Sequence, residues 1–162
     1  MNTPSELAAY LARTLASEIV PLRAIPDGPA TAKSNRRSGD GWSQREELGH
    51  LIDSAVNNHA RFVRAVLEPV YEGPGYEQAG WVEVHRYREI PWTEVVDAWQ
   101  AHNRILVPMI TAIPQAKLAT PCRVGSGAPV TLAFLIDDYV LHMKHHIDQV
   151  LQRSAVTKYP RA

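Results

Sequence analysis

Two of the seven histidines in this 162-residue sequence, His142 and His146, are four residues apart. On an α-helix, residues at this spacing lie one turn above each other on the same face, so their imidazoles can converge on one ion. Neutral imidazole binds zinc, nickel, copper and iron. The pair therefore indicates metal binding, although such a pair can equally form a solvated or hydrogen-bonded polar stripe on a helix.

A third histidine strengthens the metal hypothesis. His50 lies between Leu48 and Leu51 in an apolar stripe that predicts a separate helix, and a histidine in such a stripe should point inward. An inward histidine alone is more often a hydrogen-bonded core residue than a ligand. Three imidazoles from two helices, however, would leave positions open for water or substrate, as in a catalytic metal site.

The spacing alone does not decide which residue pairs with His142. His145 is three residues away, which is also a usable helical spacing. It lies on the other side of His142 from His146, so the two cannot pair with His142 equally well. The remaining histidines are not assigned to this site by their spacing: His59, His85 and His102.

Four predicted helices must position these side chains, and the first two begin with capping boxes. In residues 3–6 (Thr-Pro-Ser-Glu) and 43–46 (Ser-Gln-Arg-Glu), the hydroxyl and the glutamate can each satisfy a backbone N–H at the helix start. The apolar periodicity predicts that the first helix ends near Pro21 and that the second runs to about Pro69.

The other two helices have less regular boundaries. A third should start near residues 91–94, and Pro108 inside its pattern should kink or end it. Thr131 is the expected N-cap of a final helix that reaches about Gln152. The four helices should each have about 15 to 27 residues.

Long Pro- and Gly-containing connections separate the helices, at residues 25–41, 70–90 and 114–130. The connection over 70–90 is too long for a tight turn and should lie over one end of the bundle. Tyr87 and Val124 are expected in short extended pieces. The predicted fold class is all-α, an antiparallel-type four-helix bundle with long loops.

Composition favours one ordinary globular domain over residues 1–162, with 45% apolar and 21% charged residues. Lys plus Arg and Asp plus Glu both number 17, so no basic field indicates nucleic acid or an anionic membrane as a partner. The single cysteine, Cys122, cannot form an internal disulfide and is expected to be a packing residue, with a nucleophilic role as the weaker alternative. The sequence shows no signal peptide and no long apolar run, so a cytoplasmic location is expected.

Across about residues 40–152 the chain resembles the DinB/YfiT-like family of metalloenzymes. The matching stretches are Gly41-Trp42-Ser43, His50-Leu51-Ile52-Asp53-Ser54, Asn58, Arg61-Phe62, Val130-Thr131-Leu132, Asp138-Tyr139, and His142, His145, His146 and Gln149.

The resemblance implies a four-helix bundle of the DinB/YfiT-like type in which three histidines hold a metal ion. Their positions fall on His50, His142 and His146, so the resemblance selects His146 over His145. It also implies that the ion is nickel or zinc and that the chain forms a homodimer.

The resemblance implies a metal-dependent transferase that joins a low-molecular-weight thiol to a small electrophile. Some relatives look like S-transferases that use bacillithiol, mycothiol or glutathione, and others like mycothiol-dependent isomerases. A metal ion can stabilise a thiolate at neutral pH, which is the chemistry that these reactions share. Two alternatives remain open: a metal-assisted hydrolase, or a non-catalytic stress-response bundle with a vestigial site.

Residues near the histidines can assist in the site. Asp53 lies one turn after His50 and Asp138 one turn before His142, so either carboxylate can accept the second ring N–H of a ligand. Either can also be a surface or helix-dipole carboxylate. Three more side chains can contact substrate: Asn58, Arg61 and Tyr139. Arg61 can equally form a structural ion pair, and the four tryptophans are expected as core residues or pocket walls.

Overall fold

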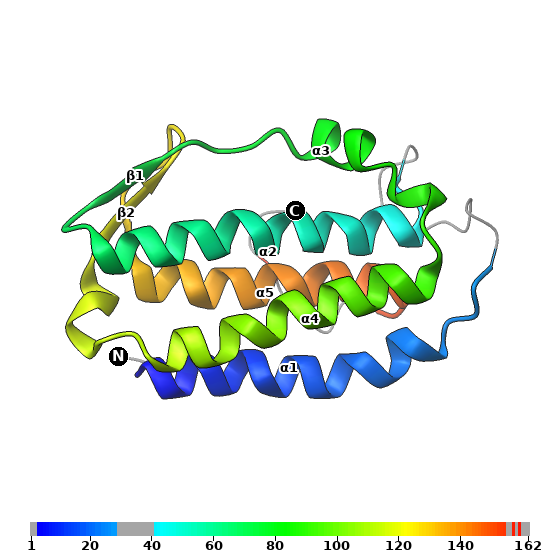
Figure 1. Cartoon of the computed structure of the whole chain (residues 1–162), viewed down its shortest axis with the longest axis horizontal. Coiled ribbons are helices and arrows are strands. Elements are labelled where there is room, and N and C mark those ends of the chain that lie inside the picture. The colour runs from blue at the N-terminus through cyan, green and yellow to red at the C-terminus, as the bar shows by residue number, and fades with distance from the viewer. Residues whose placement is uncertain (1–2, 29–40, 155–156, 158, 160–162) are drawn as a thin grey trace.

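The computed structural model describes residues 3–28, 41–154, 157 and 159, and four long helices form its body (Figure 1). These helices are α1 (Pro4–Ala24), α2 (Gln44–Leu67), α4 (Trp92–Thr111) and α5 (Leu132–Val150). The predicted all-α four-helix bundle is confirmed.

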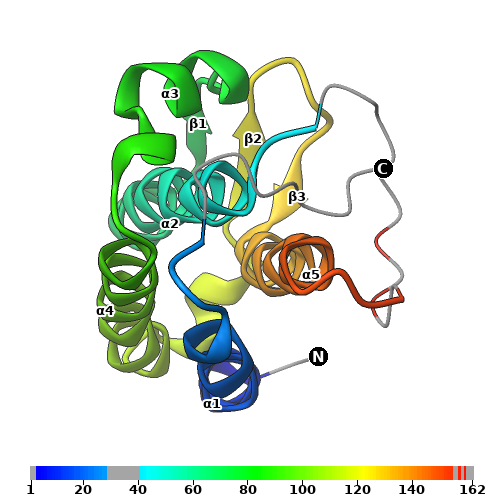
Figure 2. The same cartoon turned by 90° about the vertical axis from the view of Figure 1, so that its right-hand side faces the viewer.

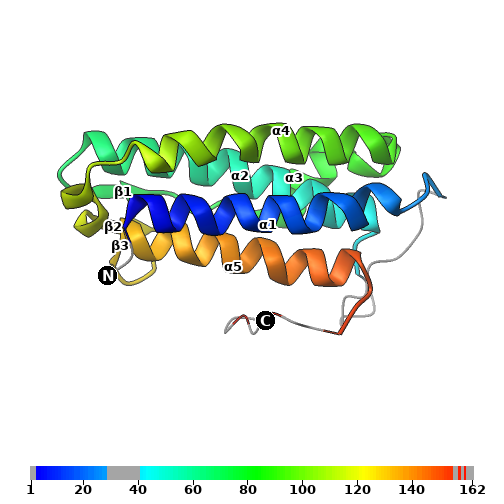
Figure 3. The same cartoon turned by 90° about the horizontal axis from the view of Figure 1, so that it is seen from below.

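The order of the helices around the bundle differs from their order in the chain. Seen end-on, α1 and α2 occupy opposite corners, and each packs against both α4 and α5 (Figure 2). From below, α1 runs between α4 and α5 (Figure 3). The α1–α4 and α2–α5 pairs are antiparallel, whereas α1–α5 and α2–α4 are parallel (Figure 1). The predicted antiparallel-type arrangement is therefore wrong for two of these pairs. The long connections make these crossings possible, because a short loop would force neighbouring helices to be antiparallel.

The helix starts are those that the sequence predicts. Thr3 and Glu6 form a reciprocal capping box at the start of α1, and Ser43 and Glu46 form another at the start of α2. The Thr131 hydroxyl accepts a hydrogen bond from the backbone N–H of Phe134 and so caps α5. Each cap satisfies backbone donors that would otherwise have no partner.

Two prolines lie inside their helices: Pro21, near which the first helix was predicted to end, and Pro108, which was predicted to kink or end its helix. α1 continues past Pro21 to Ala24, and Leu22 within that last turn is fully buried and accepts a hydrogen bond from the Trp92 indole at 2.9 Å. α4 likewise continues past Pro108 to Thr111. Packing of these last turns against the core offsets the single backbone hydrogen bond that each proline removes.

The connection over residues 70–90 does not lie over one end of the bundle. It begins with β1 (Tyr71–Gly73) at one end, returns along the length of α2, and forms α3 (Gln78–His85) and the short 3-10 helix η1 (Tyr87–Glu89) (Figure 1). α3 and η1 both pack on α2. Tyr87 is therefore helical, and not extended as expected.

A small sheet closes the end of the bundle where α2 ends and α5 begins. The connection between α4 and α5 contains the 3-10 helix η2 (Gln115–Ala119), β2 (Pro121–Val124) and β3 (Val130–Thr131). β2 pairs in parallel with β1 and antiparallel with β3. Val124 is extended as expected, but the sequence analysis did not foresee a sheet, because its strands of two to four residues come from two separate connections.

Most of the predicted loop at 25–41 lies outside the described residues, which omit 29–40. The bundle core consists of the apolar stripes of all four long helices, and its largest fully buried side chains include Trp99 and Phe62. Cys122 is buried as well, and burial raises the pKa of its thiol to about 11, which agrees with a packing role. Within the described residues, no helix is both long and apolar enough to cross a membrane.

A glycine next to His50 allows η1 to approach α2 closely. A Cβ at Gly49 would lie 2.2 Å from ring atoms of Tyr87, so we expect Gly49→Ala to destabilise the protein. The expected loss in urea unfolding is about 1–3 kcal/mol from overpacking, although alanine is the better helix former. At Gly75 a Cβ would meet nothing within 4 Å, and Gly75→Ala should change the stability by less than about 0.5 kcal/mol. Equal stability of the two variants would contradict this packing.

Candidate metal centre

Antiparallel packing of α2 on α5 brings three histidines together. His50 comes from the second turn of α2, and His142 and His146 come from the last turns of α5. The Nε2 atoms of His50 and His142 are 3.3 Å apart, and one ring nitrogen from each of the three residues lies within 4.8 Å of the others. His50 and His146 are buried, and His142 is half-buried.

The spacing of these nitrogens suits a metal ion. Metal–imidazole bonds of about 2.0–2.1 Å, with bond angles between about 90° and 110°, place two ligand nitrogens about 2.8–3.4 Å apart. The separation of 3.3 Å between His50 and His142 falls in this range. The nitrogen of the third imidazole lies within 4.8 Å of the other two, so the ring would have to move closer to complete a three-nitrogen site.

A buried glutamate orients one of the three rings. Nδ1 of His146 donates a hydrogen bond to the carboxylate of Glu47, which is fully buried in α2. This contact leaves Nε2 of His146 as the nitrogen that can face an ion, and a carboxylate in this position raises the basicity of the ligand. Sequence reasoning missed Glu47, which lies one turn before His50, because a glutamate in a first helical turn is ordinarily explained by the helix dipole.

The surroundings of His142 favour its neutral form. Burial lowers its pKa well below the ordinary value, and the neighbouring His146 and His145 lower it further. A neutral imidazole keeps the lone pair with which it binds a metal, so the ring is ready to act as a ligand at neutral pH.

His145 lies outside this group. Its Nε2 is 2.8 Å from the side-chain nitrogen of Gln149, and its ring stacks on that of Tyr159 with centroids 5.6 Å apart. The structure thus places His146, and not His145, beside His50 and His142. The spacing argument left this choice open, and the resemblance made it.

The sequence analysis suggested that Asp53 or Asp138 accepts the second ring N–H of a histidine ligand. In the structure, both aspartates contact other groups. Asp53 accepts a hydrogen bond of 2.7 Å from the Tyr87 hydroxyl and lies 3.1 Å from Nδ1 of His85. Asp138 accepts a hydrogen bond of 3.2 Å from the Tyr159 hydroxyl. Asp53 faces η1, and burial raises the pKa of its carboxyl. At His146, Glu47 takes the role that was predicted for an aspartate.

The residues suggested as substrate contacts have structural partners. Arg61 donates hydrogen bonds to the Asn58 side chain and to the carbonyl of Pro74, both at 3.3 Å, and so fastens the connection after β1 to α2. Tyr139 is buried in the core, where its hydroxyl donates to Asn103 at 2.5 Å. A direct substrate contact by Tyr139 therefore does not fit the structure, because its hydroxyl faces another core side chain.

The remaining histidines lie elsewhere on α2, α3 and α4. His59 and His102 meet edge to face across the α2–α4 seam, with ring centroids 5.4 Å apart. This contact depends on which helices are neighbours, so the sequence alone could not identify it.

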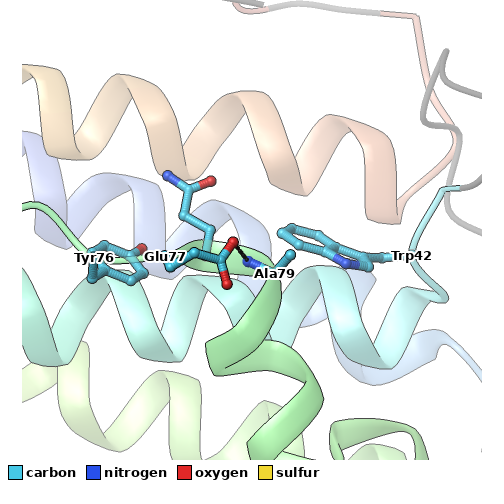
Figure 4. A pocket seen from close by; sticks show the side chains of 5 residues that line it. Trp42, Tyr76, Glu77 and Ala79 are labelled. Carbon is cyan, nitrogen blue, oxygen red and sulfur yellow. Dashed lines mark hydrogen bonds between the residues drawn. The ribbon is translucent and has the colours of Figure 1, made fainter.

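An open pocket of about 500 Å³ lies beside His50. Trp42, Tyr76 and residues 77–79 line it, and Figure 4 shows the Trp42 and Tyr76 rings at its two ends. The His50 ring is 5.0 Å from the Trp42 ring and 6.5 Å from the Tyr76 ring, measured between centroids. This arrangement can hold a small organic molecule next to an ion bound by the histidines.

Comparison with known proteins agrees with this architecture. The model of the DinB superfamily matches residues 5–150. The chain belongs to the DinB superfamily. A solved structure of YfiT from Bacillus subtilis, described as a probable metal-dependent hydrolase with an unusual four-helix bundle topology, matches with a TM-score of 0.79 and 17% identity over 94% of this chain and 87% of that one. A search among curated proteins finds no match.

Removing the charge of Glu47 should weaken metal binding without removing a ligand. We expect Glu47→Gln to lower the affinity about 10- to 100-fold in a competition with a chromophoric chelator, because His146 loses its carboxylate partner. The matched control is Glu46→Gln, since Glu46 contacts Ser43 and Arg88 instead. Equal affinities of the two variants would contradict the role assigned to Glu47.

Proposed function

We propose that this DinB superfamily member is a metal-dependent enzyme that acts on a small molecule. The observation that carries the proposal is the convergence of His50, His142 and His146, with Glu47 on one ring and a pocket alongside. Three protein ligands leave coordination positions for a reactant, which is the arrangement of catalytic sites. The description of YfiT as a probable metal-dependent hydrolase supports the proposal.

The proposed cofactor is one divalent ion, nickel or zinc. A donor set of three imidazoles suits both ions. Carboxylate ligands would favour magnesium and thiolate ligands would favour copper(I), and this group of three histidines contains neither. The half-buried position of His142 gives the ion access to the solvent side of the site.

The reaction that we place first is the transfer of a low-molecular-weight thiol to an electrophile. A bound divalent ion supplies a nucleophile at neutral pH by lowering the pKa of a thiol or of water. His50, His142 and His146 would position the ion, while Glu47 would hold the Nδ1 proton of His146. Thiol transfer needs no separate side-chain base, and the carboxylates of Asp53 and Asp138 are hydrogen-bonded to tyrosine hydroxyls.

A second candidate is metal-assisted hydrolysis, which the description of YfiT favours. Its best base in this chain would be Asp53, a buried carboxyl whose pKa is raised by burial and which lies one turn from His50. The two candidates differ in one requirement, because hydrolysis would proceed without any thiol.

The proposal also includes a homodimer in the cytoplasm, as the sequence and the family resemblance imply. Sedimentation velocity on the purified chain tests the oligomeric state, and a purely monomeric species at micromolar concentration would rule out the dimer.

Each proposed ligand should be needed for metal binding, and the neighbouring histidine should not. We expect His50→Ala, His142→Ala and His146→Ala to lose stoichiometric metal in elemental analysis after dialysis, and His145→Ala to keep it, because His145 contacts Gln149 and Tyr159 instead. Metal loss in His145→Ala with retention in His146→Ala would reverse the assignment. Absence of metal from the wild-type protein would favour a non-catalytic bundle.

The metal-loaded enzyme should consume a thiol and an electrophile together. We expect bacillithiol, mycothiol or glutathione to react with a bimane or epoxide electrophile faster in the presence of the loaded protein. Chelation and His142→Ala should abolish the acceleration, and His145→Ala should preserve it. Hydrolysis of ester substrates without a thiol, lost in the same variants, would select the second candidate. No metal-dependent turnover of either kind would refute the enzymatic proposal.

A further inference from the structure

Two aromatic residues, Trp42 and Tyr76, line the pocket beside His50, together with Glu77, Gln78 and Ala79. Trp42 precedes α2, and Tyr76 to Ala79 belong to the connection that returns along α2. Figure 4 shows the two rings at opposite ends of the pocket, with Glu77 and Ala79 between them. A volume of about 500 Å³ is in the range of small-molecule sites and accommodates a single ring with substituents.

The two aromatic rings that line the pocket, those of Trp42 and Tyr76, both lie next to His50. The His50 ring is tilted against the Trp42 ring at 5.0 Å and stacked with the Tyr76 ring at 6.5 Å. A flat group in the pocket can therefore contact the Trp42 and Tyr76 faces while its polar end reaches the histidines. Aromatic pairs in offset-stacked or edge-to-face arrangements gain about 0.5–1.5 kcal/mol beyond the burial of their surface.

The charge lining the pocket is negative. Both carboxylate oxygens of Glu77 accept backbone hydrogen bonds, from Ala79 at 3.1 Å and from Gly80 at 2.5 Å, so its charge is held in place at the pocket. Of the described residues that line the pocket, none is a lysine or an arginine. The guanidinium of Arg61 lies over the Tyr76 ring at 5.8 Å and hydrogen-bonds to Pro74.

The Tyr76 side chain lines the pocket with an uncharged phenol. The side-chain amide of Gln78 adds a second neutral polar group. Neutral donors and acceptors can orient a polar uncharged substrate, but they do not compensate an anionic one.

We propose that the substrate of this site is an uncharged molecule carrying an aromatic ring, bound between Trp42 and Tyr76 with its reactive group toward the three histidines, and that Glu77 selects against anionic analogues. This inference rests on the proposed metal site and specifies the class of molecule that the site accepts.

The contact with Trp42 and Tyr76 can be tested with two metal-chelating probes, one that carries an aromatic ring and one that does not. Benzohydroxamate and acetohydroxamate bind metals through the same group, so the ratio of their dissociation constants on the metal-loaded protein measures the ring contact alone. We expect benzohydroxamate to bind about tenfold more tightly, since ring contacts of this kind contribute at that level. Trp42→Ala should reduce the ratio to about twofold or less, with the metal content unchanged.

Two further variants provide a control and a replacement for Trp42→Ala. Phe134→Ala removes a half-exposed ring at the other end of α5 and should leave the ratio at its wild-type value. If Trp42→Ala does not fold, Tyr76→Leu removes the opposite ring while keeping an apolar side chain, and it should lower the ratio as well. A wild-type ratio near one would overturn the inference although the metal is bound, whereas a wild-type protein without metal would overturn the proposed function itself.

The charge selection has its own probe. We expect a benzohydroxamate with a carboxylate on the far side of the ring to bind about threefold more weakly than the unsubstituted compound, because the negative charge of Glu77 is near the solvent and partly screened. Glu77→Gln keeps an acceptor oxygen for Ala79 and Gly80 and should abolish the difference. An unchanged difference in this variant would show that Glu77 does not select substrates.

Discussion

The candidate metal centre depends on the antiparallel packing of α2 against α5. His50 and His142 are 92 positions apart in sequence, and only the contact between these two helices brings their Nε2 atoms within 3.3 Å of each other. Leu51 and Met143, which neighbour them in sequence, are buried in the same core. Burying imidazole nitrogens costs free energy unless they are hydrogen-bonded or ligated, so apolar packing along the rest of the seam must hold the polar cluster together.

Glu47 distinguishes this cluster from an ordinary group of hydrogen-bonded core histidines. A fully buried carboxylate is costly in a helical core unless a donor or a positive charge lies beside it. His146 provides the donor, and burial together with its histidine neighbours keeps His142 neutral. The cluster therefore joins three imidazoles to a buried carboxylate that orients one of them. A carboxylate that accepts the second ring N–H of a histidine is common at metal sites, and this contact supports the metal proposal independently of the ring distances.

The sequence predicted the local features well and the non-local ones poorly. Capping boxes at Thr3 and Ser43 depend on residues three apart, and the inward position of His50 depends on a stripe within one helix. The role of Glu47 depends on His146, 99 positions away, and the His59–His102 contact depends on α2 and α4 being parallel neighbours. No periodicity within one segment carries that information, because the order of helices around a bundle is set by how the connections cross it.

The metal ligands and the pocket wall belong to different kinds of structure. The three histidines lie on two core helices, whose packing fixes them, whereas four of the five pocket residues lie on the connection between α2 and α4. Contacts of Arg61 with Pro74, of Asp53 with Tyr87, and of Gly49 with the Tyr87 ring fasten this connection to α2. Substitutions at residues 76–79 can therefore change the shape and charge of the pocket while the ligand geometry stays intact. For this reason a shared bundle at 17% identity carries over the fold, while the substrate has to be inferred from the residues of the pocket itself.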